Sequence, residues 1–258
     1  MYAPPSAESR ALADAAREGR ADEVARLLAD PRVGPAAHCN AALLIAACTG
    51  HAAVVALLLA DPRVDPAASN SRADPAARDN EALRVAACNG HAGVVALLLA
   101  DPRVDPAACN SRVLWWAAAC GRAEVVALLL ADARADPAAE DNCAIRHAAA
   151  YGRAEVVALL LADPRVDPAA DNNSAIRHAA AHGRTESAVL LLADPRADPA
   201  ALFRPGFAAF RARPPVAEAL SARRAWSPRR AAWVAAAVAA AHARARADAA
   251  LADALAEC

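Results

Sequence analysis

Histidine is the side chain whose spacing in this chain could support chemistry. His178 and His182 lie four residues apart, and His147 stands 31 residues before His178. Residues four apart share one face of a helix, and three imidazoles brought together could bind zinc or copper. The competing explanation is that arginine and histidine recur within a copied I-R-H-A-A segment. Because no cysteine or acid stands in register as a further ligand, the sequence predicts no metal and no cofactor.

Motifs that would indicate an enzyme are missing from the sequence. There is no G-x-G-x-x-G or Walker-type phosphate loop, no G-x-S-x-G nucleophile turn and no C-x-x-C pair. The seven cysteines are an odd number, and Cys48 and Cys88 recur at one position of a repeat. Such cysteines are typical of free thiols in a reducing compartment. We therefore expect an intracellular protein without catalytic residues.

A repeating segment must position these side chains. Six glycines are 31 residues apart, except for one interval of 40. The longer interval contains RADPAARDN at residues 72–80, which nearly duplicates RADPAAEDN at 134–142, and it predicts a longer loop. Self-similarity at this period is the signature of stacked repeats. The glycines are Gly19, Gly50, Gly90, Gly121, Gly152 and Gly183.

Each repeat predicts two short helices followed by an extended finger. In the fifth copy, Ile145, Ala148 and Ala149 form an apolar stripe at helical spacing. Gly152 is expected to end that helix, and a second helix should run to the Asp-Pro pair at 163–164, because the residue before proline disfavours helical geometry. The recurring Asp and Arg of the finger, D-P-R, predict ion pairs between repeats at a solvated edge, each worth about 0–1 kcal/mol.

The helical segments resemble the ankyrin-repeat family. Its signature T-P-L-H-x-A-A-x-x-G-H-x-x-V-V-x-L-L-L is matched by residues 174–180 (SAIRHAA) and by Gly50-His51 with the V-V-x-L-L-L run at 54–59. Arginine replaces the family's histidine at Arg84, Arg146 and Arg177, and D-P-R-V-D-P replaces its usual finger. The resemblance implies an all-α ankyrin-repeat solenoid of about six helix-turn-helix repeats with a helical C-terminal extension.

The same pattern divides the chain into segments. We expect a flexible N-terminus over residues 1–8 and six repeats over 9–202, with the longer loop at 69–79. Residues 203–226 are expected to form a degenerate repeat or a C-terminal cap, and residues 227–258 an alanine- and arginine-rich helix.

The resemblance also implies a binding surface. In the family, variable positions of the first helix of each pair line a concave face that contacts partners. We expect Trp115 in the core and Trp116 in the groove, where tryptophan and tyrosine are common binding hot spots. The positions predicted to contact a protein partner are Ile45, Thr49, Val85, Asn89, Trp116, His147, Tyr151, His178 and His182.

Two alternative functions follow from charge and composition. Residues 203–258 carry nine arginines and four acids, a net charge of +5, which leaves −6 for residues 1–202 of a chain whose total is −1. A basic C-terminal region could associate with nucleic acid or an anionic surface. All 28 basic residues are arginine, which would also suit the substrate-recruiting adaptor of a ubiquitin ligase. We expect a monomeric interaction module or scaffold with no transmembrane segment.

Overall fold

The computed structural model describes residues 7–66, 80–203 and 205–222. These residues form fourteen α-helices and two short 3-10 segments, and no strand occurs among them. The chain divides into two compact units between Cys109 and Asn110. The loop expected at 69–79 and the helix expected at 227–258 lie outside the described residues.

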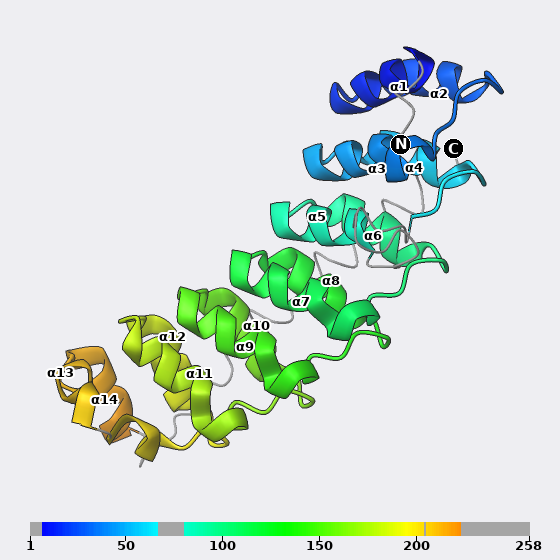
Figure 1. Ribbon diagram of the computed structural model, residues 1–258. Helices are drawn as coiled ribbons and strands as arrows, with labels where there is room; N and C mark the ends of the chain where they lie inside the picture. Colours follow the sequence, from blue (N-terminus) through cyan, green and yellow to red (C-terminus); the bar gives the residue numbers. More distant parts are fainter. Residues whose placement is uncertain (1–6, 67–79, 204, 223–258) are drawn as a thin grey trace, which may run out of the picture. The chain divides into compact units, whose positions relative to one another are not determined.

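The first unit contains three helix pairs. The first helices α1, α3 and α5 pack in one row, and the second helices α2, α4 and α6 pack in another (Figure 1). α1 begins at Ala7, two residues before the expected start of the first repeat at residue 9. The helices are α1 (Ala7–Arg17), α2 (Ala21–Leu28), α3 (Ala37–Thr49), α4 (Ala52–Ala60), α5 (Glu81–Asn89) and α6 (Ala92–Ala100).

The second unit repeats this arrangement and adds a terminal helix pair. α9 packs against α11, α8 and α12 pack on either side of α10, and α14 packs against α12. The boundary between the units falls in the first turn of α7. The elements are α7 (Ala108–Cys120), α8 (Ala123–Ala131), α9 (Ala139–Tyr151), α10 (Ala154–Ala162), α11 (Ala170–Ala181), α12 (Thr185–Ala193), η1 (Pro199–Phe203), η2 (Pro205–Phe207), α13 (Ala208–Arg211) and α14 (Pro214–Ala222).

Leucine, isoleucine and alanine fill the core at repeat spacing. Ile145 is 1% exposed and the pair Ala148 and Ala149 is fully buried, so the predicted apolar stripe is confirmed. Each fully buried leucine or isoleucine contributes about 1.5–3 kcal/mol through removal of its surface from water. The small alanines let neighbouring helices approach closely. The leucines and isoleucines that recur in this layer are Leu12, Leu43, Leu83, Leu114, Ile145 and Ile176 in first helices and Leu58, Leu98, Leu129, Leu160 and Leu191 in second helices.

The repeat glycines end their helices and also receive a side chain from the next repeat. Gly50 has φ +82°, and a Cβ atom there would lie 2.5 Å from Nδ1 of His91. In the second unit arginine replaces histidine at this position, so that Arg184 packs on Gly152. His91 Nε2 lies 2.9 Å from the Cys48 carbonyl oxygen, which caps the preceding helix as well.

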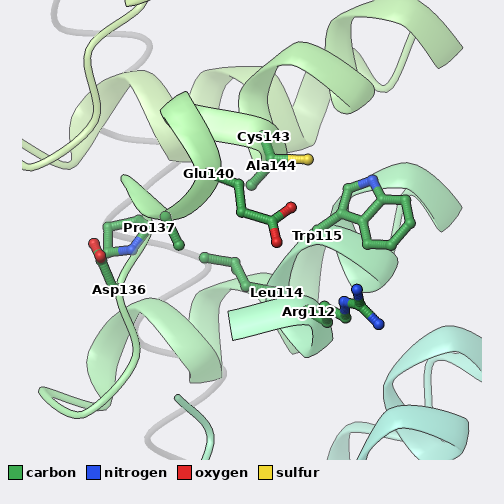
Figure 2. A pocket seen from close by; sticks show the side chains of 9 residues that line it. Arg112, Leu114, Trp115, Asp136, Pro137, Glu140, Cys143 and Ala144 are labelled. Atoms are coloured by element: carbon green, nitrogen blue, oxygen red, sulfur yellow. The ribbon is translucent and has the colours of Figure 1, made fainter. Parts of the chain in front are cut away.

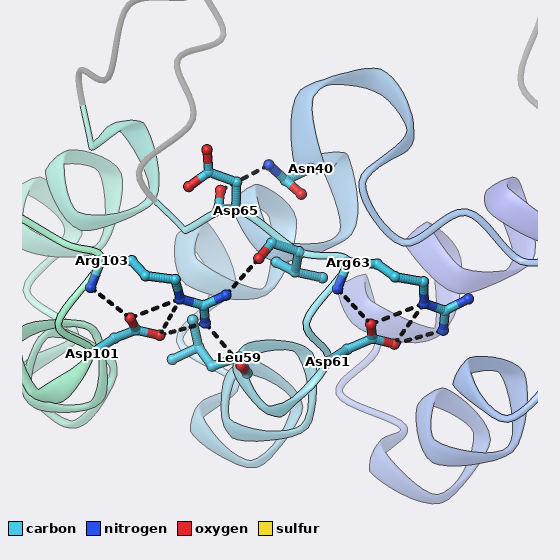
Figure 3. Close-up of polar contacts among 8 residues, drawn as sticks. Asn40, Leu59, Asp61, Arg63, Asp65, Asp101 and Arg103 are labelled. Atoms are coloured by element: carbon cyan, nitrogen blue, oxygen red, sulfur yellow. Dashed lines mark hydrogen bonds and ion pairs between the residues drawn. The ribbon is translucent and has the colours of Figure 1, made fainter.

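The finger arginines connect neighbouring repeats, although not by the ion pairs that the sequence predicted. Arg103 pairs with Asp101 of its own finger at 2.6 Å. Its guanidinium also donates to the carbonyl oxygens of Val64, at 2.8 Å, and Leu59, at 2.9 Å, in the preceding repeat (Figure 3). The correction has a geometric cause: the Asp lies only two positions before the Arg, so the carboxylate pairs within the finger and orients the planar guanidinium toward main-chain acceptors.

A left-handed asparagine lies in the first turns of α3, α9 and α11 and at the N-cap of α5, and the sequence analysis did not identify it. Asn40 has a left-handed φ of +59°, which asparagine tolerates better than most residues. Its side chain donates to the carbonyl oxygen of Asp65 at 2.9 Å (Figure 3). Equivalent side chains bond the main chain of Asp105, Asp167 and Asp198. The signal was present in the sequence, since Asn40, Asn80, Asn142 and Asn173 each stand ten residues before a repeat glycine.

Candidate binding surface on the first helices

The predicted contact residues lie on first helices of both units. α3 carries Ile45 and Thr49, and α5 carries Val85 and Asn89. In the second unit, Trp116 lies on α7, His147 and Tyr151 on α9, and His178 on α11, with His182 at the C-cap of α11.

In the first unit the polar side chains of this surface are already bonded to the protein. Thr49 Oγ1 donates to the Ile45 carbonyl oxygen at 2.8 Å. Asn89 Nδ2 donates to the Cys48 carbonyl oxygen at 3.1 Å. The first bond holds Thr49 against its own helix, and the second connects Asn89 of α5 to α3, so the polar groups of this surface lie among apolar ones and are already hydrogen-bonded.

In the second unit four rings form a connected group, which we call the aromatic cluster: Trp115, Trp116, His147 and Tyr151. The ring centroids of the two tryptophans are 4.4 Å apart, and Trp115 meets His147 edge-on at 5.1 Å. His147 and Tyr151 are 6.3 Å apart. Tyr151 is 53% exposed, so the cluster ends in a large ring open to solvent.

Trp115 is not a core residue, which corrects the sequence-based expectation. Both tryptophans are half-buried, and Trp115 lines a pocket with Arg112, Glu140 and Cys143 (Figure 2). Its indole Nε1 is buried without a hydrogen-bond partner. The core position in this turn of α7 belongs instead to Leu114, which is 2% exposed.

The main chain fixes the tautomers of two histidines. His147 Nδ1 lies 2.9 Å from the Cys143 carbonyl oxygen, and His182 Nδ1 lies 2.9 Å from the His178 carbonyl oxygen. A carbonyl oxygen only accepts hydrogen bonds, so each Nδ1 carries a proton. The other ring nitrogen, Nε2, is then the one through which each imidazole can meet a ligand.

The His178 ring is shifted toward its neutral form. Partial loss of solvent around the exposed ring lowers its pKa, and the charges of Arg177 and Arg146 lower it further, followed by those of His182 and His147. The rings of His178 and His182 are 6.5 Å apart. Among the residues that the structure describes, no group of three or more histidine, cysteine, aspartate or glutamate side chains is placed to hold a metal ion.

Two arginines beside these histidines hold the backbone in an unusual conformation. Arg146 donates to the Glu140 carbonyl oxygen at 2.9 Å and pairs with the Asp171 carboxylate at 3.0 Å. Arg177 donates to the carbonyl oxygens of Asn172, at 3.0 Å, and Asp171, at 2.9 Å. Both arginines thus clamp left-handed turns, at residues 140–142 and 171–173, that precede the helical part of α9 and α11.

Cys143 illustrates why the site does not resemble a nucleophilic centre. Its Sγ lies 3.2 Å from His147 Nδ1, the spacing of a thiol–imidazole pair. Burial raises the pKa of the Cys143 thiol, whereas a reactive cysteine needs its pKa lowered. The environment of this thiol thus differs from that of a reactive cysteine.

Comparison with known proteins supports the repeat assignment. A family model described as ankyrin repeats (3 copies) matches residues 12–109 and again residues 114–201. No match is found among curated proteins or solved structures. No helix in the described part of the chain is both long and apolar enough to cross a membrane.

Proposed function

Because the chain belongs to the ankyrin-repeat family, whose repeats are generally protein-interaction modules, we propose that it binds a protein partner on its first helices. In the second unit the contact surface comprises the aromatic cluster together with His178 and His182. In the first unit, Ile45, Thr49, Val85 and Asn89 occupy the equivalent positions on α3 and α5.

The observation that supports this proposal is the aromatic cluster. Tyr151 is 53% exposed although its ring adjoins a packed group of three others. Large rings held in place by neighbours bury much area on binding at a low cost in side-chain entropy. Tyrosine and tryptophan are accordingly the side chains that most often dominate binding energies.

A reducing compartment fits the thiols of the described residues. Cys48, Cys88, Cys120 and Cys143 are not in disulfides. We propose an intracellular interaction module on this basis. The nucleic-acid alternative rests on the basic region 203–258, most of which lies outside the described residues, and the ligase-adaptor alternative rests on the absence of lysine.

The experiment is capture of partners from a cell lysate of the source organism with the full-length chain, read by mass spectrometry. The test variant is Trp116→Ala/Tyr151→Ala. The matched control is Phe203→Ala, since Phe203 is 63% exposed but lies in η1, outside the first helices. We expect partners that bind the wild type and the control to be lost from the double variant. Equal recovery by all three chains would exclude the aromatic cluster as the contact surface.

A further inference from the structure

Three imidazoles and two guanidiniums lie on the neighbouring helices α9 and α11, and four of these groups act electrostatically on the fifth, His178. The imidazoles are His147, His178 and His182, which we call the imidazole cluster. His147 and His182 each bond a carbonyl oxygen of their own chain through Nδ1 at 2.9 Å. Protonation of these rings would add an N–H donor at Nε2 without disturbing the existing bond, so each ring is prepared to donate to an incoming acceptor.

The charges that act on His178 are predominantly positive. On its own helix they come from Arg177 and His182, and from α9 they come from Arg146 and His147. Each of these charges lowers the pKa of His178.

The acidic groups of the helices that pack against α11 are Glu140 and Asp141 in the first turn of α9 and Glu186 and Asp194 of α12. Asp171 pairs with Arg146 at 3.0 Å. On α12, Glu186 lies in the first turn, and Asp194 lies at the C-cap, paired with Arg196 at 2.7 Å. The 3-10 segment η1, which packs against α11, has no charged residue.

This arrangement favours an anionic ligand. A lysine or arginine of a partner would meet like charge from Arg146 and Arg177, which disfavours its docking. A metal ion would need a further ligand, and the described residues supply no suitable group. A carboxylate accepts hydrogen bonds through both oxygens and favours the charged form of a nearby imidazole.

We propose that the imidazole cluster binds a carboxylate of an acidic partner segment, with a proton taken up from solvent at an imidazole Nε2 on binding. The proposal rests on the proposed function, because the same partner would place an apolar side chain on the adjoining aromatic cluster. The partner segment is therefore an acidic peptide that also carries an apolar or aromatic residue.

Proton uptake by the imidazole cluster and binding of the carboxylate should strengthen each other. The pKa of His178 lies below its usual value in the absence of ligand, so the ring is mainly neutral near neutral pH. A bound carboxylate raises that pKa, so the complex holds more protons than the unbound protein. Affinity must then increase as pH falls through the range between the two pKa values.

The test begins with selection of binders from a random dodecapeptide library at mildly acidic pH. The full-length wild type, His178→Gln/His182→Gln and Trp116→Ala/Tyr151→Ala serve as three baits. Both histidines are exposed, and thermal unfolding of each variant verifies that it is folded. We expect wild-type peptides to be enriched in aspartate and glutamate by about twofold or more over the library, and this enrichment to disappear with the histidine variant.

The second measurement is the dissociation constant of the most enriched peptide against pH. We expect binding to wild type to be about three- to tenfold tighter at pH 6 than at pH 8, with a clearly smaller dependence for His178→Gln/His182→Gln, which keeps only His147 of the imidazole cluster. Peptides without acidic enrichment, or an acidic peptide whose affinity for wild type does not change with pH, would overturn the inference. If the aromatic variant alone loses the peptides, the proposed function stands while the carboxylate site is rejected. If neither variant changes the selection, both are rejected.

Discussion

Single residues at the repeat boundaries combine backbone geometry with packing. Gly50 ends α3 in a left-handed conformation, and the ring of the following repeat's His91 lies against its α-carbon. A side chain at this position would therefore meet two separate penalties. One is the cost of a left-handed residue with a Cβ atom, and the other is displacement of a ring that caps the end of the same helix.

Gly50→Ala tests this combination. We expect a loss of about 1–3 kcal/mol in the free energy of unfolding, from the left-handed φ and the contact with His91. The matched control is Gly93→Ala, because Gly93 lies inside α6 with no atom near its potential Cβ position. This control should stabilise by about 0.5–1 kcal/mol, as alanine favours a helix interior. Urea unfolding measures both, and changes of the same sign would contradict the explanation.

At the residue scale, the sequence predicted the helix ends but not the side chains that cover them. The glycine spacing predicted where helices end, because a left-handed terminus is a local property. The side chain that covers the glycine comes from the next repeat, about 40 residues away for His91 and Gly50, and local patterns do not reveal it. The same holds for the candidate site: repeat register located the contact residues on the first helices, whereas the exposure of Trp115 and the tautomers of the histidines depend on neighbours in space.

At the scale of elements, α12 departs from its counterparts. Where α10 has Val156 and Val157, α12 has Ser187 and Ala188, and all four side chains are buried. The Ser187 hydroxyl has no hydrogen-bond partner. A buried hydroxyl without a partner is unfavourable, and the smaller side chains also bury less apolar surface. The interior of the sixth repeat is therefore less well stabilised than that of the fifth.

Ser187→Val should restore part of the stability that the sixth repeat lacks. The equivalent position accepts valine in α10, so we expect a gain of about 1–2 kcal/mol in the free energy of unfolding, from added apolar burial and removal of the unbonded hydroxyl. The reciprocal change Val156→Ser should cost at least as much. Thermal and urea unfolding of the two variants measure the effects. A destabilised Ser187→Val chain would show that the sixth repeat cannot accommodate the larger side chain.

At the scale of the whole molecule, a single motif recurs at the edge of both units. The D-P-R fingers place an arginine against carbonyl oxygens of the preceding repeat, through Arg63 and Arg103 in the first unit and Arg165 and Arg196 in the second. Each guanidinium is oriented by the aspartate two residues before it. Because stability in repeat proteins is approximately a sum over repeats and their interfaces, a change that affects every finger accumulates along the chain.

A fall in pH affects every finger, because it protonates the aspartates that orient the arginines. Hydrogen bonds from Arg63, Arg103 and Arg134 hold the pKa values of Asp61, Asp101 and Asp132 below their usual value. For carboxyls with lowered pKa, the stabilisation is complete above the unfolded-state pKa, about 3.9, and is lost as pH falls through the folded-state pKa. We therefore expect the free energy of unfolding to change little on this account at neutral pH and to fall steeply below about pH 4.

Asp101→Asn separates this effect from general acid unfolding. At neutral pH the variant should be less stable than wild type by about 1–2 kcal/mol, because the amide orients Arg103 less strongly than the carboxylate does. As pH falls and Asp101 becomes protonated in wild type, the difference between the two chains should shrink toward zero. Urea unfolding at a series of pH values measures the two curves. If they stay parallel to the lowest pH at which wild type folds, the fingers do not cause the acid sensitivity, and the orientation of Arg103 does not depend on the charge of Asp101.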